Sequence, residues 1–146
     1  MAKNEATLAT LKIDGFKDRK VTAYNYGFSQ AIDKENQPAG IPRGGRLYVK
    51  VDAFSQEENV ELLNWMVSKT MKKNGEIVVM VPSDPDKTLK KIQFEDAYCV
   101  DYKESWADVV RNTDGSMKEP STNSEEIWIT WRKKKVGPVE YENEWV

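Results

Sequence analysis

Apolar and polar residues alternate along most of the chain, and this alternation predicts β-strands. Residues 6–13 form one expected strand, which ends at the turn signal Asp14-Gly15. Residues 20–30 resume the alternation with three aromatic residues on one face, and a further strand is expected at 46–52. The first third of the chain therefore predicts a β-hairpin followed by another strand.

The middle of the chain carries a pattern of helical period at residues 56–73. Ser55 is a residue type that favours the N-cap, and Asn74-Gly75 supplies a stop signal. The apolar stripe repeats at spacings of three and four: Val60, Leu63, Val67 and Met71, with Leu62 and Met66 beside it. We therefore expect one helix at about 56–73 whose apolar stripe packs on the core.

Three more strands are expected in the second half. Residues 76–81 are apolar without interruption, which indicates a strand covered on both faces. Residues 88–102 form a long strand that turns Cys99 toward its more polar face, and residues 126–134 form the last strand. Between these two strands, the polar and turn-rich residues 111–124 indicate an exposed loop. On the long strand the apolar face carries Ile92, Phe94, Tyr98, Val100 and Tyr102.

Several strands, one helix and no βαβ alternation indicate a mainly β fold. We expect a small antiparallel β-barrel or sandwich with one flanking helix, in a single domain of residues 1–146. Large residues occur on both faces of some strands, as with Tyr48 and Val49 or Trp128 and Trp131. A small barrel has one interior, so its outer apolar residues need another partner, and self-association is the simplest source of one.

The composition of the chain disfavours several classes of function. The chain has 146 residues, a net charge of −2, one cysteine and no histidine. These values disfavour nucleic-acid binding, histidine catalysis and Cys/His zinc sites, and no helical stretch reads as a membrane anchor. We assign no catalytic residue, cofactor or metal ligand, and we interpret Lys133 to Lys135 as a solvated strand end. The sequence thus predicts a protein that is not an enzyme.

Two segments are the candidate contact elements. The loop at 31–45 carries two prolines and three glycines, and the end of the chain at 136–146 carries aromatic residues among carboxylates. Long loops in compact domains tend to be functional, and a terminus stays ordered only when something holds it. We expect the tail to lie against its own barrel or against a neighbouring subunit. The candidate interface residues are Asp33, Pro38, Arg43, Gly44, Gly45, Tyr141 and Trp145.

The order of these segments resembles a known family. The chain contains "YNYGFSQAIDKENQPAG", "GGRLYVKVD", a helical segment, "IQFEDAYCVDYKESW", "WITWRKKKVG" and the closing "ENEW". In this order they are similar to the haemolysin-coregulated tube protein of type VI secretion systems, in the version found in Bacteroidetes. An Asp and a Pro in the long loop, Gly-Gly before a strand and the "ENEW" end carry most of the resemblance.

The resemblance implies a function and partners. It implies a hexameric ring of small barrels that stacks into the inner tube, which a contractile sheath propels and which ends in a spike protein. It further implies that the lumen carries effector proteins, and that the subunit is cytoplasmic before assembly and is exported without a signal peptide. The alternative from the residues alone is a small monomeric barrel that binds a ligand or a carbohydrate.

Overall fold

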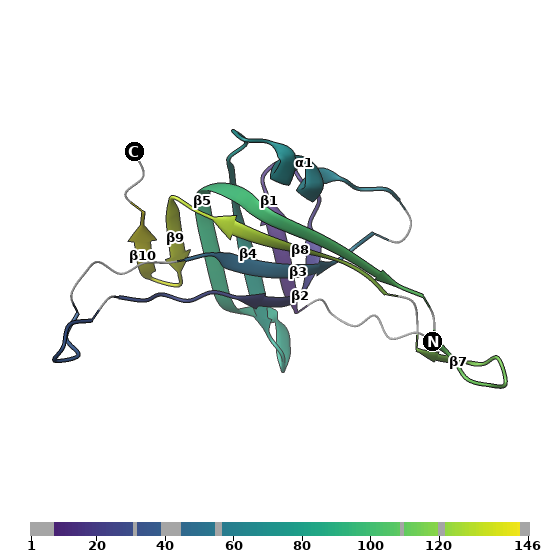
Figure 1. The fold of residues 1–146 in the computed structure, drawn as a ribbon. Coiled ribbons are helices and arrows are strands. Elements are labelled where there is room, and N and C mark those ends of the chain that lie inside the picture. Colours follow the sequence, from purple (N-terminus) through teal and green to yellow (C-terminus); the bar gives the residue numbers. More distant parts are fainter. Residues whose placement is uncertain are drawn as a thin grey trace.

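The computed structural model describes residues 8–30, 32–38, 45–54, 57–108, 110–119 and 122–143. Within these residues the chain is mainly antiparallel β-structure with one short helix (Figure 1). The strands are β1 (Ala9–Ile13), β2 (Arg19–Asn25), β3 (Leu47–Asp52), β4 (Lys73–Val81), β5 (Asp84–Ala107), β6 (Val110–Arg111), β7 (Met117–Glu119), β8 (Thr122–Thr130), β9 (Lys133–Val136) and β10 (Val139–Glu142), and the helix is α1 (Glu61–Val67). The expected fold class is confirmed.

The main sheet closes on itself. Its strand order is β10-β9-β5-β4-β1-β2-β3-β8, and β5 also pairs with β8, so that β5, β4, β1, β2, β3 and β8 form a barrel. The first half of β5 pairs with β4 on one side and β9 on the other, whereas its second half pairs with β8. One strand of 24 residues therefore joins both halves of the barrel.

The period-two pattern places the core as expected in several strands. Leu47, Val49 and Val51 of β3 are buried, and Ile127 and Ile129 lie opposite them on β8. The helix α1 adds Leu62 and Trp65 to the same core, and the indole of Trp65 donates to the carbonyl of Met71 at 3.1 Å. Burial of these large side chains supplies most of the driving force for folding.

The helix is shorter than the sequence pattern predicts. It spans Glu61–Val67 instead of 56–73, and the expected stop at Asn74-Gly75 lies inside β4. Asn59 accepts from the backbone N–H of Glu61, while Ser68 accepts from the N–H groups of Thr70 and Met71. These side-chain hydrogen bonds compete with helical hydrogen bonds on both sides of α1, and the backbone at Ser68 is extended. The prediction that the apolar stripe packs on the core is also wrong, since Val60, Leu63 and Val67 are exposed.

Cys99 is buried, at 5% exposure, although the sequence placed it on the polar face of its strand. The physical reason is an irregularity at Asp96, which has a φ of 49° and breaks the alternation, so that Phe94 and Ala97 are both buried. A second register shift follows between Cys99 and Asp101. Burial raises the pKa of the Cys99 thiol to about 12, so this cysteine stays protonated.

The predicted loop at 111–124 is partly ordered. β6 and β7 pair as a hairpin around a turn at Asn112 to Ser116, in which the carboxylate of Asp114 accepts from Ser116. Residues from Thr122 onward already belong to β8. Figure 1 shows this hairpin beyond one end of the barrel, while the connection between β2 and β3 reaches out beyond the other end, next to β9 and β10.

Gly75 gives the first prediction. A Cβ at Gly75 would lie 2.6 Å from the carbonyl oxygen of Lys12 and 2.8 Å from the ring of Phe94. Gly75→Ala should therefore lower the free energy of unfolding by about 1–3 kcal/mol, the usual cost of overpacking. Urea unfolding at one fixed protein concentration measures this loss. Gly27→Ala is the control, because a Cβ there meets nothing within 4 Å; equal losses in both variants would contradict the packing argument.

Candidate functional site

The connection from residue 26 to 46, here called the arm, ends in a fixed turn. The carboxylate of Asp33 accepts from the backbone N–H groups of Glu35 and Gln37 at 2.9 and 3.0 Å. The N–H of Asn36, which has a positive φ, donates to the carbonyl of Asp33, and Ile32 forms a bridge with Pro38. Asp33 and Pro38 thus shape the arm tip, and the expected long loop contains an ordered turn in its described part.

The remaining candidates of the arm lie away from its tip. Gly45 has a φ of 58°, in the left-handed region that favours glycine, two residues before β3 begins. The structure therefore assigns Gly45 a conformational role at the base of the arm. Arg43 and Gly44 lie outside the described residues. Asp33 and Pro38 lie at the arm tip, whereas Tyr141 lies on β10, so the sequence-predicted residues fall into two separate groups.

The tail was expected to lie against its own barrel or against a neighbouring subunit. Strand β10 pairs with β9, and the ring of Tyr141 packs edge-on against Trp131 at 5.4 Å and against Phe28 at the same distance. The side-chain amide of Asn143 donates to the carbonyl of Trp131 at 2.6 Å. As far as residue 143, the tail is therefore held by its own chain, and it also holds the base of the arm through Phe28. Trp145 lies outside the described residues.

Lys134 of β9 lies inside this aromatic cluster, which the sequence did not reveal. Its side chain is 1% exposed, and its Nζ lies 3.5 Å from the ring centroid of Tyr26 and 5.1 Å from that of Phe28. Among the described residues its Nζ has no hydrogen-bond partner, and burial lowers its pKa to about 7. The interpretation of Lys133 to Lys135 as a solvated strand end is wrong for Lys134. The feature of the sequence that could have revealed this site is the group of aromatic residues Tyr26, Phe28, Trp131 and Tyr141.

The opposite end of the barrel contains a buried ion pair that sequence reasoning also missed. Arg19 and Glu125 are each at most 4% exposed and bond to each other, and Tyr102 donates to the second oxygen of Glu125 at 2.7 Å. Arg19 also donates to the carbonyl of Asp52 at 3.0 Å. Burial, followed by this bond to a carboxylate, raises the pKa of Tyr102. These hydrogen bonds join β2, β3, β5 and β8 at this end of the barrel.

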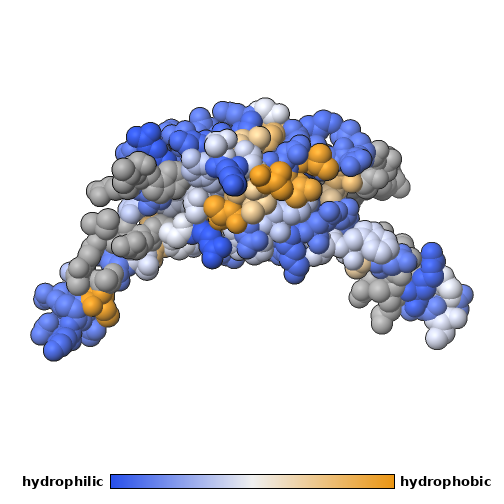
Figure 2. Space-filling view, turned by 45° about the horizontal axis from the view of Figure 1, so that its top comes forward, coloured by the Kyte–Doolittle hydropathy of each residue, from blue (hydrophilic) through white to orange (hydrophobic). Residues whose placement is uncertain are grey.

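Apolar residues also remain on the surface, over α1. Val60, Leu63 and Val67 form a stripe along its outer side, and Val67 is 69% exposed. Val100 of β5 is a further exposed apolar residue, and α1 packs along β5. Figure 2 brings the α1 side forward and shows apolar residues gathered in a band among hydrophilic ones. This α1 stripe is an unpartnered surface of the kind that marks a protein contact.

Two strand edges of the barrel are also open in the described structure. Residues 23–25 of β2 pair with β3, but β1 pairs only with Arg19 and Lys20. Residues 101–107 of β5 pair with β8, but β4 pairs with β5 only as far as Ala97. An open edge presents unpaired N–H and C=O groups that can pair with another chain. One copy thus offers these two edges of the barrel, besides the outer edge of β10 at the end of the sheet.

The described residues contain no group of three His, Cys, Asp or Glu side chains placed to hold a metal ion, and no helix long and apolar enough to cross a membrane. On the outer face, Tyr48 and Trp128 stack at 5.0 Å, and Tyr48 donates to Glu126. These two aromatic residues, expected to need another chain, therefore partly cover each other.

Comparisons with known proteins agree on one family. The family model for "Hemolysin coregulated protein Hcp (TssD)" matches residues 5–146. Among solved structures, Hcp1 from Flavobacterium johnsoniae is 30% identical, with a TM-score of 0.72, and the match covers 93% of this chain and 99% of that one. No curated protein matches.

More distant structures share the fold. Hcp1 from E. coli EAEC 042 is 12% identical with a TM-score of 0.63, over 96% of this chain and 100% of that one. A type VI secretion system effector from Yersinia pestis is 15% identical with a TM-score of 0.63, over 92% and 99%.

Lys134 generates a prediction on pH. Its pKa is about 7 in the folded protein against 10.5 for an ordinary lysine. Between these two pH values the unfolded chain binds a proton that the folded chain lacks. The contribution of Lys134 to the free energy of unfolding therefore rises as the pH rises from about 7 to about 10.5. Below pH 7 the full cost of the buried charge is present, partly offset by the surrounding rings.

Lys134→Met should remove that rise and should stabilise the fold at pH 6 by about 1–3 kcal/mol, the usual cost of a buried unsatisfied donor. Urea unfolding at pH 6 and pH 9 measures both effects. Lys133→Met is the matched control, because the Lys133 side chain is 36% exposed and pairs with Glu140. If Lys134→Met kept the pH dependence of the unmodified protein, the claim that the buried amine of Lys134 causes it would be wrong.

Proposed function

The chain belongs to the Hemolysin coregulated protein Hcp (TssD) family, the tube proteins of type VI secretion, and we propose that its copies form hexameric rings that stack into the inner tube. The single observation that carries the family is the match over residues 5–146. The protein is accordingly a structural subunit. Its surfaces support this function because they leave apolar and backbone groups without partners in one copy.

The open strand edges support a ring. The edge of β2 at residues 22–25 and the edge of β5 at residues 100–107 belong to different strands, so β2 of one copy would pair with β5 of the next. Such a contact uses two different patches of each copy, and repeated rotation by the same angle closes it into a ring. Backbone hydrogen bonds would then continue the sheet from one subunit to its neighbour.

The α1 stripe supports the same assembly. Val67 is 69% exposed and Val60 and Leu63 lie beside it, so a second copy that covered them would remove apolar area from water. We propose that a neighbouring subunit is this partner, since Val60 and Leu63 line one pocket with Tyr102 and Glu104, in the half of β5 that carries an open edge. Strand pairing and apolar burial would then strengthen one contact.

The finer parts of the function follow from the family. We propose that a contractile sheath surrounds the tube, that a spike protein ends it, and that effector proteins travel in its lumen. We propose further that the subunit leaves the cytoplasm through the secretion apparatus, without a cleaved signal peptide.

A monomeric ligand-binding barrel is the competing function. Trp65, Trp131 and Phe94 fill the barrel and are at most 1% exposed, which argues against a ligand inside it. The two functions differ in the mass of the native species.

Native mass spectrometry with negative-stain microscopy tests the proposal. At tens of micromolar protein and near-physiological salt we expect a hexamer with a central hole, and a strict monomer would contradict the tube function. Val67→Glu should reduce the hexamer fraction at least about tenfold, because a charge would have to be buried in the contact. Leu89→Glu is the matched control, since Leu89 is similarly exposed but lies outside the proposed contacts. Both variants should melt like the unmodified monomer.

A further inference from the structure

The side chain of Lys134 lies at a junction of several segments of the chain. In the sheet, Lys134 is opposite Phe94 of β5 on one side and Tyr141 of β10 on the other. Its Nζ lies 3.5 Å from the ring centroid of Tyr26 in the arm and 5.4 Å from that of Trp131, which follows β8. The amine therefore lies where the barrel, the tail and the base of the arm meet.

This junction contains two buried donors that lack an acceptor among the described residues. They are the Nζ of Lys134 and the indole N–H of Trp131, and both side chains are at most 1% exposed. A buried ammonium without an acceptor is costly, and the faces of aromatic rings offset only part of that cost. The neutral amine of Lys134 therefore fits this junction better than the charged amine does.

The charged groups next to Lys134 on the strands lie on the opposite face of the sheet. Side chains alternate along a strand, so the neighbours of Lys134 on β9 and the residues opposite them point away from it. These residues are Lys133 and Lys135 on β9, Glu95 on β5, and Glu140 and Glu142 on β10. Glu140 pairs there with Lys133 at 3.7 Å and with Lys135 at 3.9 Å.

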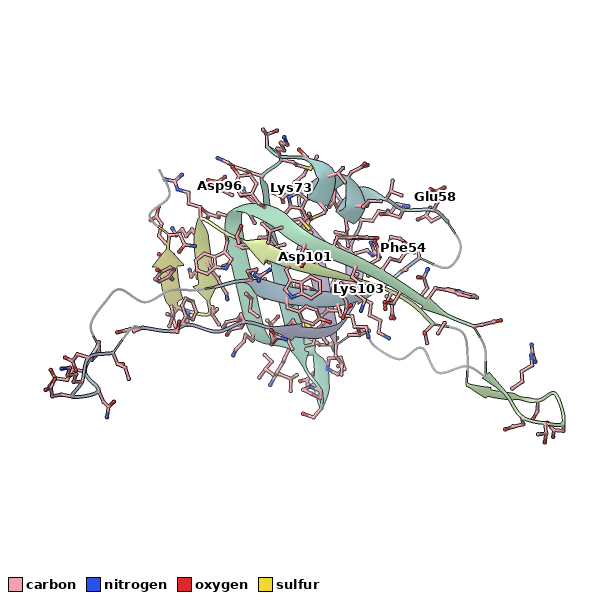
Figure 3. All side chains as sticks on the ribbon, in the orientation of Figure 1. Phe54, Glu58, Lys73, Asp96, Asp101 and Lys103 are labelled. Carbon is pink, nitrogen blue, oxygen red and sulfur yellow. The ribbon has the colours of Figure 1, made fainter. Side chains whose placement is uncertain are left out.

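The other elements around the amine add no carboxylate on its face. Asp96, which Figure 3 labels at the bend of β5 near the start of β9, pairs with Arg132 at 3.4 Å, and Arg132 also pairs with Glu142. Residues 26–30 of the arm carry no charged side chain. The ionisable groups that face Lys134 are thus the phenols of Tyr26 and Tyr141, so no anion compensates a charge on its amine.

The elements that cover the amine can open without the barrel. Tyr26 and Phe28 follow the end of β2 outside any strand, and Phe28 is 43% exposed. Tyr141 lies on β10, a strand of four residues at the edge of the sheet (Figure 1). The connection from β9 to β10 contains Gly137, which has a φ of 55°. Short edge elements of this kind open at a much lower free energy than the core strands do.

We propose that Lys134 is a pH-sensitive latch, whose neutral amine keeps the arm base and the tail closed and whose protonation favours an open state. In the open state the rings of Tyr26, Phe28 and Tyr141 move away and water hydrates the ammonium, while the barrel stays folded. One amine thereby sets how firmly two separate segments are held. The latch acts within one copy, so it goes beyond the proposed function and does not depend on it.

The direction of the pH effect follows from the two states. Burial lowers the pKa of Lys134 to about 7 in the closed state, whereas the hydrated amine of the open state has the ordinary value of 10.5. Between these two pH values the open state binds a proton that the closed state lacks. The ratio of open to closed protein should therefore rise about tenfold for each unit by which the pH falls, until it becomes constant below about pH 7.

Hydrogen–deuterium exchange at pH 7, 8 and 9 tests the latch, with each rate divided by the intrinsic rate at that pH. The reporters are residues 139–143, where the N–H of Asn143 donates to the carbonyl of Arg132 at 2.6 Å. Their protection factor should rise about tenfold per pH unit. Residues 47–51 of β3 report global unfolding and should stay more protected than the tail. Equal protection of both segments at every pH would overturn the latch, because the tail would then open only with the whole fold.

Substitution of the amine supplies the second part of the test. Lys134→Met should give residues 139–143 the same protection factor at all three pH values. Lys133→Met is the matched control and should keep the tenfold rise, because Lys133 lies on the opposite face and pairs with Glu140. A rise that persisted in Lys134→Met, or that was absent from the unmodified protein, would overturn the proposal.

Carbon-13 NMR of the lysine side chains tests the same amine without any substitution. In the unmodified protein one lysine should titrate at a pH well below the others, since only the closed state holds a buried amine. If all lysines titrated together near the ordinary value of 10.5, the latch would be overturned.

Discussion

The closure of the barrel by β5 is the constraint on which the rest of the structure depends. This strand pairs with β4 and β9 in its first half and with β8 in its second half. It changes partners around Asp96, where the φ is positive, and again shifts register after Cys99. The change of partner closes the barrel, and it leaves residues 100–107 of β5 with an open edge beside α1. Core and contact surface therefore arise from one strand.

Each end of the barrel contains a buried basic side chain, and different neighbours stabilise the two charges. Arg19 has a carboxylate partner, Glu125, and its guanidinium lies 4.6 Å from the centroid of the Phe54 ring. Lys134 has aromatic rings around it and loses much of its charge near neutral pH, while it connects β9 to the base of the arm. Buried polar groups that are costly on their own are thus paired differently at the two ends of the barrel.

The sequence predicts the fold wherever period two is unbroken. Leu47, Val49 and Val51 on β3 and Ile127 and Ile129 on β8 are buried as the alternation requires. It fails at Cys99, because one residue with a positive φ reverses the faces of a strand and no local signal marks it. It fails at α1, because hydrogen bonds from Asn59 and Ser68 and the burial of Trp65 override a longer helical pattern. Asp33 and Tyr141 were predicted as interface residues, and that role stays a prediction. Lys134 needed the three-dimensional structure, since its aromatic neighbours Tyr26 and Phe28 are distant in the chain.

The central claim is that rings form through the surfaces that one copy leaves without partners, and hydrogen–deuterium exchange on assembled and dissociated protein tests it most directly. Assembly should slow exchange at residues 22–25 of β2 and 100–107 of β5, because the amides there that lack a strand partner within one copy would gain hydrogen bonds from a neighbouring copy. The tight turn at residues 82 and 83 between β4 and β5 should exchange equally in both states. Rings that formed without added protection at either strand edge would contradict this account.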